Sequence, residues 1–345
     1  MAKDKLQPAE MVLKKVLDCD TYWDILRIIK KKCFLNICMG GRGIGKTTQS
    51  NIFACENFRN RAEEFIYVRR YKSECASQEH LLDSIVDGVS FRGDKKGGGI
   101  YSWGGNTLGY IIPLSISQQY KSVNFENVSL IIFDEAIIPL GSPIHYLKDE
   151  IIALLEFAST VFRHRKNGKI LVLGNNLNFF NPYCEYFNVK VFNDLYVDNE
   201  RGLLVEFAKH SPALLKIEED TPLFKLTKGT AYHEYHYNNN VLTNNKVEIV
   251  KKRPNDKLVC RLIFNSYTLN IYTRSDGKML LESVRKVIED DYSYYVMMDN
   301  QPNYYNIDLL RKTWFGIIKY RYYHFQIDYA DENSSSIMNY IVDMF

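Results

Sequence analysis

The chain has 345 residues, of which 46% are hydrophobic and 25% are charged. These proportions are ordinary for a globular protein with a buried core, and they exclude a fibrous or largely disordered polypeptide. Basic and acidic residues nearly balance, 44 against 41, which gives a formal net charge of +3. A chain this close to neutral has no uniformly basic surface, so any contact with nucleic acid has to be local.

The seven cysteines are scattered and form no Cys-x-x-Cys pair. An odd, unpaired set predicts reduced thiols rather than a disulfide framework or a cysteine zinc site. The N-terminal stretch "MAKDKLQPAEMVLKKVLDCD" is charged throughout, and no segment approaches the roughly 18 apolar residues of a membrane helix. We therefore expect a soluble protein of the cytoplasm.

The first part of the chain alternates between helical and strand patterns. Residues 9–30 have the apolar spacing of an amphipathic helix. The apolar run "CFLNICM" predicts a buried parallel strand, followed by a helix from Lys46 to about Phe58. A second strand is predicted over residues 64–69, and a hairpin around a turn rich in glycine and lysine is predicted over residues 88–114.

Two further buried strands follow, with a helix between them. "VSLIIFDEA" and "GKILVLGNN" predict the strands, and "YLKDEIIALLEFASTVF" has apolar residues at helical spacing. Strands that alternate with helices predict an α/β domain with a mainly parallel sheet and helices on both faces. Because ligands of such sheets bind at the carboxyl ends of the strands, we expect the functional side chains at those ends.

The pattern changes after about residue 212. "AYHEYHYNNNVLTNNK" is rich in asparagine and predicts a linker. The residues that follow alternate like antiparallel strands, and "NIDLLRKTWFGIIKYRYYHF" predicts an aromatic-rich helix. We predict an α/β domain over residues 1–212, a linker region over 213–246, and an α+β domain over 247–345.

The segment after the first strand matches a phosphate-binding loop. Residues 40–47 read Gly-x-x-x-x-Gly-Lys-Thr. Glycines let backbone N–H groups face the phosphate oxygens, and the following helix N-terminus favours anions. We expect Lys46 to reach the β- and γ-phosphates and the Thr47 hydroxyl to bind Mg²⁺. The predicted nucleotide-binding residues are Gly40, Gly41, Arg42, Gly43, Ile44, Gly45, Lys46, Thr47 and Thr48.

An Asp-Glu pair ends the third predicted strand. We expect Asp134 to hold Mg²⁺ together with Thr47, and Glu135 to polarise the attacking water as general base. The pair, and the strand and hairpin that precede it in sequence, separate this chain from the GTPase-like group. They indicate a P-loop ATPase of the additional-strand, catalytic-glutamate class, which hydrolyses ATP.

Two other residues lie at element ends and have competing interpretations. Asn175 follows the fourth strand, where an amide could contact both the attacking water and the γ-phosphate, or could simply make a turn. Arg163, in "VFRHRKNGK", is either an arginine finger that reaches a neighbouring subunit or part of a basic helix C-terminus. The residues alone leave both choices open.

Several weaker patterns have mainly structural interpretations. His233 and His236 have no third ligand and no HExxH pattern beside them. "YVRRYK", the loop "FRGDKKGGG" and the mixed aromatic and basic "KYRYYHF" are each compatible with nucleic acid or with an ordinary structural role.

Longer motifs point to one family. These are "GGRGIGKTT", "FIYVRRYKSE", "IIPLSISQQYKS", "NVSLIIFDEAI", "TVFRHR" and "LGNN…NPY". In this order and at about this spacing, the chain resembles the terminase-like genome-packaging ATPases of phi29-type bacteriophages along nearly its whole length. The segment before residue 30 is longer and more charged than we expect from that family.

The resemblance implies a function and a set of partners. Such proteins assemble as a ring, usually a homopentamer, and use ATP to drive double-stranded DNA through the ring. The ring acts in the host cytoplasm, transiently at the portal vertex of an empty prohead, and a structural packaging RNA scaffolds it. By motif match, Arg163 becomes a finger acting on the next subunit and Lys121 a second interface cation.

The resemblance also implies that the C-terminal domain is a vestigial RNase H-like nuclease. Asp276, Asp290 and Asp291 show no clear metal-binding constellation, which fits that interpretation. Two alternative functions remain: a helicase-like ATPase of phage or plasmid replication, and a nucleotide-gated portal or RNA adaptor without sustained hydrolysis.

Overall fold

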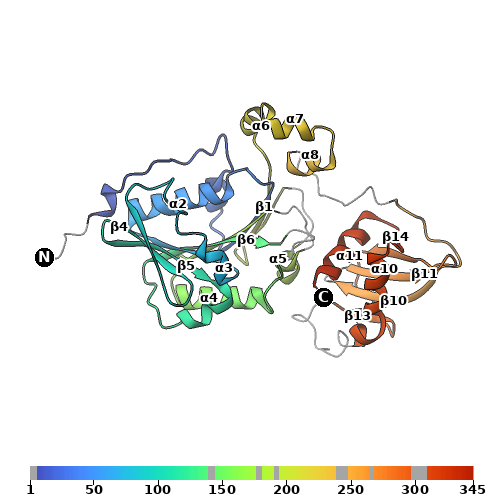
Figure 1. The fold of residues 1–345 in the computed structure, drawn as a ribbon. Helices are drawn as coiled ribbons and strands as arrows, with labels where there is room; N and C mark the ends of the chain where they lie inside the picture. Colours follow the sequence, from blue (N-terminus) through green and yellow to red (C-terminus); the bar gives the residue numbers. More distant parts are fainter. Residues whose placement is uncertain are drawn as a thin grey trace. The chain divides into compact units, whose positions relative to one another are not determined.

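The computed structural model describes residues 6–138, 144–175, 181–189, 194–237, 248–264, 267–296 and 309–344. The chain divides into two compact units (Figure 1). The first consists of residues 1–177 and 191–241, and the second of residues 178–190 and 242–345. Within the described ranges, no helix is both long enough and apolar enough to cross a membrane.

The first unit is built on a nine-stranded sheet with the order β3-β4-β5-β2-β6-β7-β1-β9-β8. The strands from β5 to β9 in this order run parallel, and β3, β4 and β8 pair antiparallel at the two margins. This confirms the predicted mainly parallel sheet. The strands are β1 (Leu35–Gly40), β2 (Glu64–Arg69), β3 (Val89–Gly93), β4 (Gly99–Trp103), β5 (Asn106–Pro113), β6 (Val128–Ile137), β7 (Lys169–Gly174), β8 (Leu195–Asp198) and β9 (Leu203–Ala208).

Helices cover both faces of this sheet, as the sequence predicted. On one face, α2 packs with Leu130 and Ile132 of β6 in a single apolar core, and α4 lies on the opposite face (Figure 1). The helices and turns that precede β7 are η1 (Pro8–Glu10), α1 (Ile25–Ile29), α2 (Lys46–Arg61), α3 (Lys72–Ala76), η2 (Leu114–Tyr120) and α4 (Glu150–Phe162). α2 begins where the phosphate loop ends, which places the loop at the carboxyl edge of the sheet.

The order of the central strands matters for the site. β7 lies between β1 and β6, pairing in parallel with both. The strand that separates the phosphate-loop strand from the Asp-Glu strand in space is therefore β7, which comes after both in sequence. β2 and the β3–β4 hairpin, which precede β6 in the chain, lie on the other side of β6.

The helix predicted over residues 9–30 is wrong. In the described part of this segment only η1 and α1 are helical, and the chain between them consists of turns and irregular stretches with one β-bridge. Leu13 makes a β-bridge to Val86, and the Lys14 N–H donates to the Ile85 carbonyl at 2.8 Å. Met11 is buried by this irregular segment, Val12 and Val16 are exposed, and the apolar residues from Ile25 onward belong to the short helix α1. One continuous helix does not form, because backbone groups of the segment find partners elsewhere in the fold.

Several elements were not predicted, among them two strands and three helices of the first unit. β8 and β9 form an antiparallel pair, and β9 continues the sheet beside β1. Three short helices lie within the region expected to be a linker: α6 (Pro212–Glu219), α7 (Pro222–Thr227) and α8 (Ala231–His236). Each begins after a Ser or Thr whose hydroxyl accepts a backbone N–H, which is ordinary N-capping. Residues 238–247 of the expected linker lie outside the described residues.

The second unit contains a five-stranded sheet with the order β13-β10-β11-β12-β14. Its central strands are antiparallel, as predicted, and β13 and β14 add parallel margins. Apolar side chains of the sheet, α10 and α11 form one core. The elements are α5 (Pro182–Tyr186), β10 (Lys257–Phe264), β11 (Tyr267–Thr273), β12 (Met279–Val284), β13 (Ser293–Tyr295), the π-helical η3 (Arg311–Phe315), α10 (Gly316–Tyr323), β14 (Ile327–Tyr329) and α11 (Glu332–Met344).

Candidate nucleotide site at the carboxyl edge of the sheet

The phosphate loop joins the fully buried strand β1 to α2. Gly45 precedes the helix with φ 85°, a conformation that favours glycine. At Gly40, a Cβ would lie 2.6 Å from the carbonyl oxygen of Ala208, so only glycine allows β9 to approach this closely. The glycines thus fix both the turn of the loop and its packing against the neighbouring strand.

Lys46 is 5% exposed and lies at the first position of α2. Its Nζ donates to the carbonyl oxygens of Gly40 and Gly41 at 3.0 and 2.8 Å. Burial lowers the pKa of Lys46 to about 8, although the carboxylate of Asp134 acts in the opposite direction. The ammonium therefore lies inside the loop with donors directed at loop carbonyls, in the position that a phosphate-binding lysine requires.

Asp134 and Thr47 meet at this edge although they are far apart in sequence. The Thr47 hydroxyl donates to Asp134 Oδ2 at 2.8 Å, and the Tyr67 hydroxyl donates to the same oxygen at 2.6 Å. The Glu135 N–H donates to Asp134 Oδ1 at 2.9 Å. This carboxylate is thereby oriented by three donors. Tyr67 was missed from the sequence, because only the pairing of β2 with β6 brings it there.

Glu135 has φ 52°, which is unusual for a residue other than glycine. Half of its side chain is exposed, and Oε2 lies 2.5 Å from Arg69 Nη2. Arg69 also contacts Glu74 at 3.5 Å. The carboxylate is thus directed out of the sheet and held by the last residue of β2.

The second arginine of "YVRR" has a structural role. Arg70 is 2% exposed, and its Nε lies 2.5 Å from Glu150 Oε2 at the start of α4. Its Nη2 donates to the Ala136 carbonyl at 2.5 Å. Arg70 therefore ties the end of β2 to the segment after Asp134 and to α4, and the sequence alone did not separate its role from that of Arg69.

Asn175 is one residue beyond the end of β7. Gly174 pairs with Met39 of β1 and with Ile137 of β6, so Asn175 follows the strand that separates the phosphate loop from the Asp-Glu pair. The fold thus places its backbone at the predicted edge.

The N-terminal segment supports the phosphate loop, a role that the sequence did not reveal. The Trp23 N–H donates to the Ile44 carbonyl at 2.9 Å, and the Trp23 indole N–H donates to Glu206 Oε2 at 2.6 Å. A Cβ on Gly45 would lie 3.0 Å from the Tyr22 side chain. Glu206 belongs to β9, so this segment and β9 together brace the loop.

Arg163 lies at the opposite edge of the sheet. α4 begins at the carboxyl edge and runs back towards the opposite edge. Just beyond the end of α4, Arg165 Nη2 donates to the carbonyl of Phe125, at 2.8 Å, and Phe125 precedes the start of β6. Six residue steps along β6 separate that end from Asp134, or roughly 20 Å at about 3.3 Å per residue. Arg163 is exposed, and among the described residues its guanidinium has no hydrogen-bond or ion-pair partner.

Lys121 lies on the same face as Arg163. It follows η2 and makes an exposed ion pair with Glu156 of α4, with 3.7 Å between Nζ and Oε2. Neither Lys121 nor Arg163 joins the cluster around Lys46. The structure therefore brings together the predicted loop, metal and base residues, and separates the two predicted interface cations from them.

Comparisons with known proteins identify the family of the chain. The family model described as "Podovirus DNA encapsidation protein (Gp16)" matches residues 17–313. The chain belongs to this family. Its function is the packaging of viral DNA, as the sequence motifs predicted.

Curated members of the Gp16 family align with most of the chain. The DNA packaging protein of Bacillus phage phi29 is 28% identical over 313 residues, covering 86% of this chain and 91% of that protein. The DNA packaging protein of Bacillus phage B103 is 30% identical over 246 residues, covering 71% and 76%. A chain of the solved phi29 viral genome packaging motor assembly has the same fold, with a TM-score of 0.60, 23% identity, and coverage of 90% and 95%.

Proposed function

We propose that this Gp16-family chain is the ATPase subunit of a DNA-packaging motor, and that it works as a ring whose nucleotide sites are shared between neighbours. One observation carries the proposal. Lys46, Thr47, Asp134 and Glu135 meet at the carboxyl edge of the sheet, whereas Arg163 lies exposed at the other edge. An arginine so placed is too far away to act on its own subunit's phosphates, but it is free to reach those of a neighbour.

The residues at the carboxyl edge fit a nucleotide with Mg²⁺. Thr47 Oγ1 and Asp134 Oδ2 lie 2.8 Å apart and are oxygen donors, which Mg²⁺ prefers, and the ion commonly takes its remaining ligands from water and phosphate. When bound, Mg²⁺ would neutralise charge on the β- and γ-phosphates. Lys46 would add a second positive charge from inside the loop.

Glu135 is the proposed general base for the attacking water. Because Arg69 holds its carboxylate at 2.5 Å, Glu135 has to leave that ion pair before it can accept a proton from water. Asn175 is proposed to orient the same water from the end of β7. The position of β7 between β1 and β6 supports assignment to the additional-strand, catalytic-glutamate class.

We propose a vestigial nuclease for the second unit. Arg274 is 6% exposed, and its Nε lies 3.9 Å from carboxylate oxygens of Asp256 and Asp276, while Nη1 pairs with Asp328. A guanidinium at the centre of three carboxylates takes the place that a metal-dependent nuclease needs for its cations. Asp290 pairs with Arg261 and does not join this cluster.

The proposed partners are double-stranded DNA, the portal of a prohead, further copies of the chain in a pentameric ring, and a structural RNA. The family resemblance supports each of them. A helicase of replication is the weaker alternative, since the family is one of DNA encapsidation proteins. Sustained ATP turnover distinguishes a motor from a nucleotide-gated adaptor.

The test is the steady-state ATPase rate across protein concentration, with and without double-stranded DNA, for the wild-type chain and Arg163→Ala. We expect a rate per subunit that rises with concentration and DNA, and that Arg163→Ala abolishes only this assembled component. The same series of ATPase rates, measured in the presence of proheads, tests the ring when it is assembled on its portal. Equal loss of the basal rate of dilute subunits in Arg163→Ala would contradict a shared site.

A further inference from the structure

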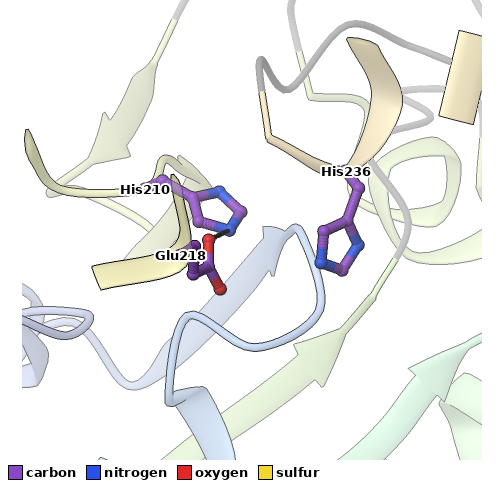
Figure 2. Close-up of side chains that lie close together, drawn as sticks. All are labelled: His210, Glu218 and His236. Atoms are coloured by element: carbon purple, nitrogen blue, oxygen red, sulfur yellow. Dashed lines mark ion pairs between the residues drawn. The ribbon is translucent and has the colours of Figure 1, made fainter. Parts of the chain in front are cut away.

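A second cluster of ligand-type side chains lies beside the phosphate loop. His210 follows β9, Glu218 lies in the last turn of α6, and His236 ends α8 (Figure 2). One nitrogen or oxygen atom from each side chain lies within 4.8 Å of the other two. The His210 and His236 rings are 5.8 Å apart between centroids. Three elements thus direct their metal-ligating atoms towards one point.

We propose that His210, Glu218 and His236 bind a transition-metal cation, with Zn²⁺ as the expected ion. Two imidazoles and one carboxylate are the ligand set of zinc sites that have three protein ligands and one open position. His210 and His236 are buried, at 7% and 9% exposure. A buried set of this kind differs from the scattered carboxylates of a protein surface, since each ligand is already largely removed from water.

The spacing is close to that of a tetrahedral site. Bonds of about 2.0–2.1 Å in tetrahedral geometry put neighbouring ligand atoms about 3.3 Å apart. His210 Nε2 and Glu218 Oε2 are 3.3 Å apart. The third ligand atom, on His236, is within 4.8 Å of the other two, and a shift of its side chain towards them would complete the set.

The charges around the cluster define which protonation states can bind metal. Arg42 and Lys46 lie near His236 and oppose a divalent ion, and the Glu218 carboxylate offsets them. A metal ion binds the neutral form of an imidazole and the ionised form of a carboxylate.

A metal at this point would connect α6 and α8 to the strand beside the phosphate loop. Glu218 Oε1 would be 3.3 Å from a Cβ placed on Gly43, so the cluster adjoins the loop itself. β9, which precedes His210, pairs with β1. The ion would therefore fix the α6–α8 segment against the nucleotide site, independently of whether the chain turns over ATP.

The experiment measures Zn²⁺ affinity of the full chain after removal of metal by a chelator, in competition with a chromophoric chelator and without nucleotide. We expect one Zn²⁺ per chain. Glu218→Gln and His236→Gln should each weaken binding by at least about 100-fold, since even loss of a group that only supports a ligand costs 10–100-fold. Co²⁺ should give the visible bands of a tetrahedral site without the near-ultraviolet absorption of a cobalt–thiolate bond.

His233→Gln is the matched control. His233 is on the same helix and equally buried at 8%, but it packs against Phe224 and lies outside the cluster. This variant should keep the wild-type affinity. If His236→Gln does not fold, the Zn²⁺ affinity of Glu218→Gln tests the proposal instead, because Glu218 is partly exposed and its substitution disturbs the core less. Absence of the Zn²⁺ site in the wild type, unchanged affinity in Glu218→Gln, or a cobalt–thiolate band would each overturn the proposal.

Discussion

At the scale of single residues, Glu135 and its ion pair with Arg69 determine what the site can do. The carboxylate is half exposed, and its backbone has a positive φ, so its direction is set by the backbone and by Arg69. We predict that Glu135→Gln leaves nucleotide affinity unchanged and lowers turnover by at least about 100-fold, because general bases contribute typically 10²–10⁴-fold. Binding of a labelled ATP analogue and steady-state hydrolysis measure the two quantities.

Glu74→Gln is the control for that substitution, because Glu74 also contacts Arg69 but not the site of hydrolysis. It should retain most of the turnover. Turnover of Glu135→Gln within a few-fold of the wild type would reject Glu135 as the base.

Lys46 gives the site a pH dependence. In the free protein burial lowers its pKa to about 8, so above that pH the ammonium loses its proton, while bound phosphate favours the protonated form. We predict that ATP affinity is constant below pH 7 and falls, by up to about tenfold per pH unit, as pH rises through 8. Titration calorimetry in two buffers should show proton uptake on binding near pH 8.5. Affinity independent of pH between 7 and 9 would contradict this.

At the scale of elements, the N-terminal segment braces the phosphate loop through Trp23. Trp23→Phe keeps an aromatic side chain but removes the indole N–H that donates to buried Glu206. It should therefore lower the free energy of unfolding by about 1–3 kcal/mol. Because Glu206 lies on β9 and pairs with Cys38 of the phosphate-loop strand β1, nucleotide affinity should fall as well. Urea unfolding and analogue binding measure both effects.

Trp103→Phe is the matched control for Trp23. The indole N–H of Trp103 donates to the Asp87 carbonyl at 2.9 Å. Trp103 lies on β4, which is remote from β1 in the order of the sheet. It should cost stability and leave nucleotide affinity unchanged. If the two variants affect nucleotide affinity equally, the N-terminal segment has no specific link to the loop.

At the scale of the whole molecule, the separation of Arg163 from Lys46 predicts complementation between subunits. Lys46→Ala and Arg163→Ala should each be inactive in assembled rings. A 1:1 mixture should recover activity, because roughly a quarter of the head-to-tail interfaces then pair an intact loop with an intact arginine. DNA-stimulated hydrolysis of the mixture, against each variant alone, is the measurement. No recovery in mixed rings would show that both residues act within one subunit.

The sequence by itself determined the parts that local pattern controls. The buried strands β1, β2, β6 and β7 are short apolar runs bounded by polar residues, and the phosphate loop has a fixed spacing of glycines before Lys46. Asp134 and Glu135 could be recognised because they directly follow the apolar run of β6, although the strand itself continues to Ile137. These features depend on neighbours in the chain, so periodicity and motif spacing are sufficient to find them.

Tertiary structure alone decided the partners that are distant in sequence. The apolar residues of 9–30 fit one helix by spacing, but only Ile25–Ile29 is a helix there, and bonding to the segment around Val86 keeps the chain near Leu13 out of one. Tyr67 reaches Asp134, and Glu206 reaches Trp23, only because of the order of strands in the sheet. His236 meets His210 across 26 residues because α8 folds back to the end of β9, which is why a local search for metal ligands found only His233 beside it. A buried polar group takes whichever partner the fold brings near, and the sequence around it does not identify that partner.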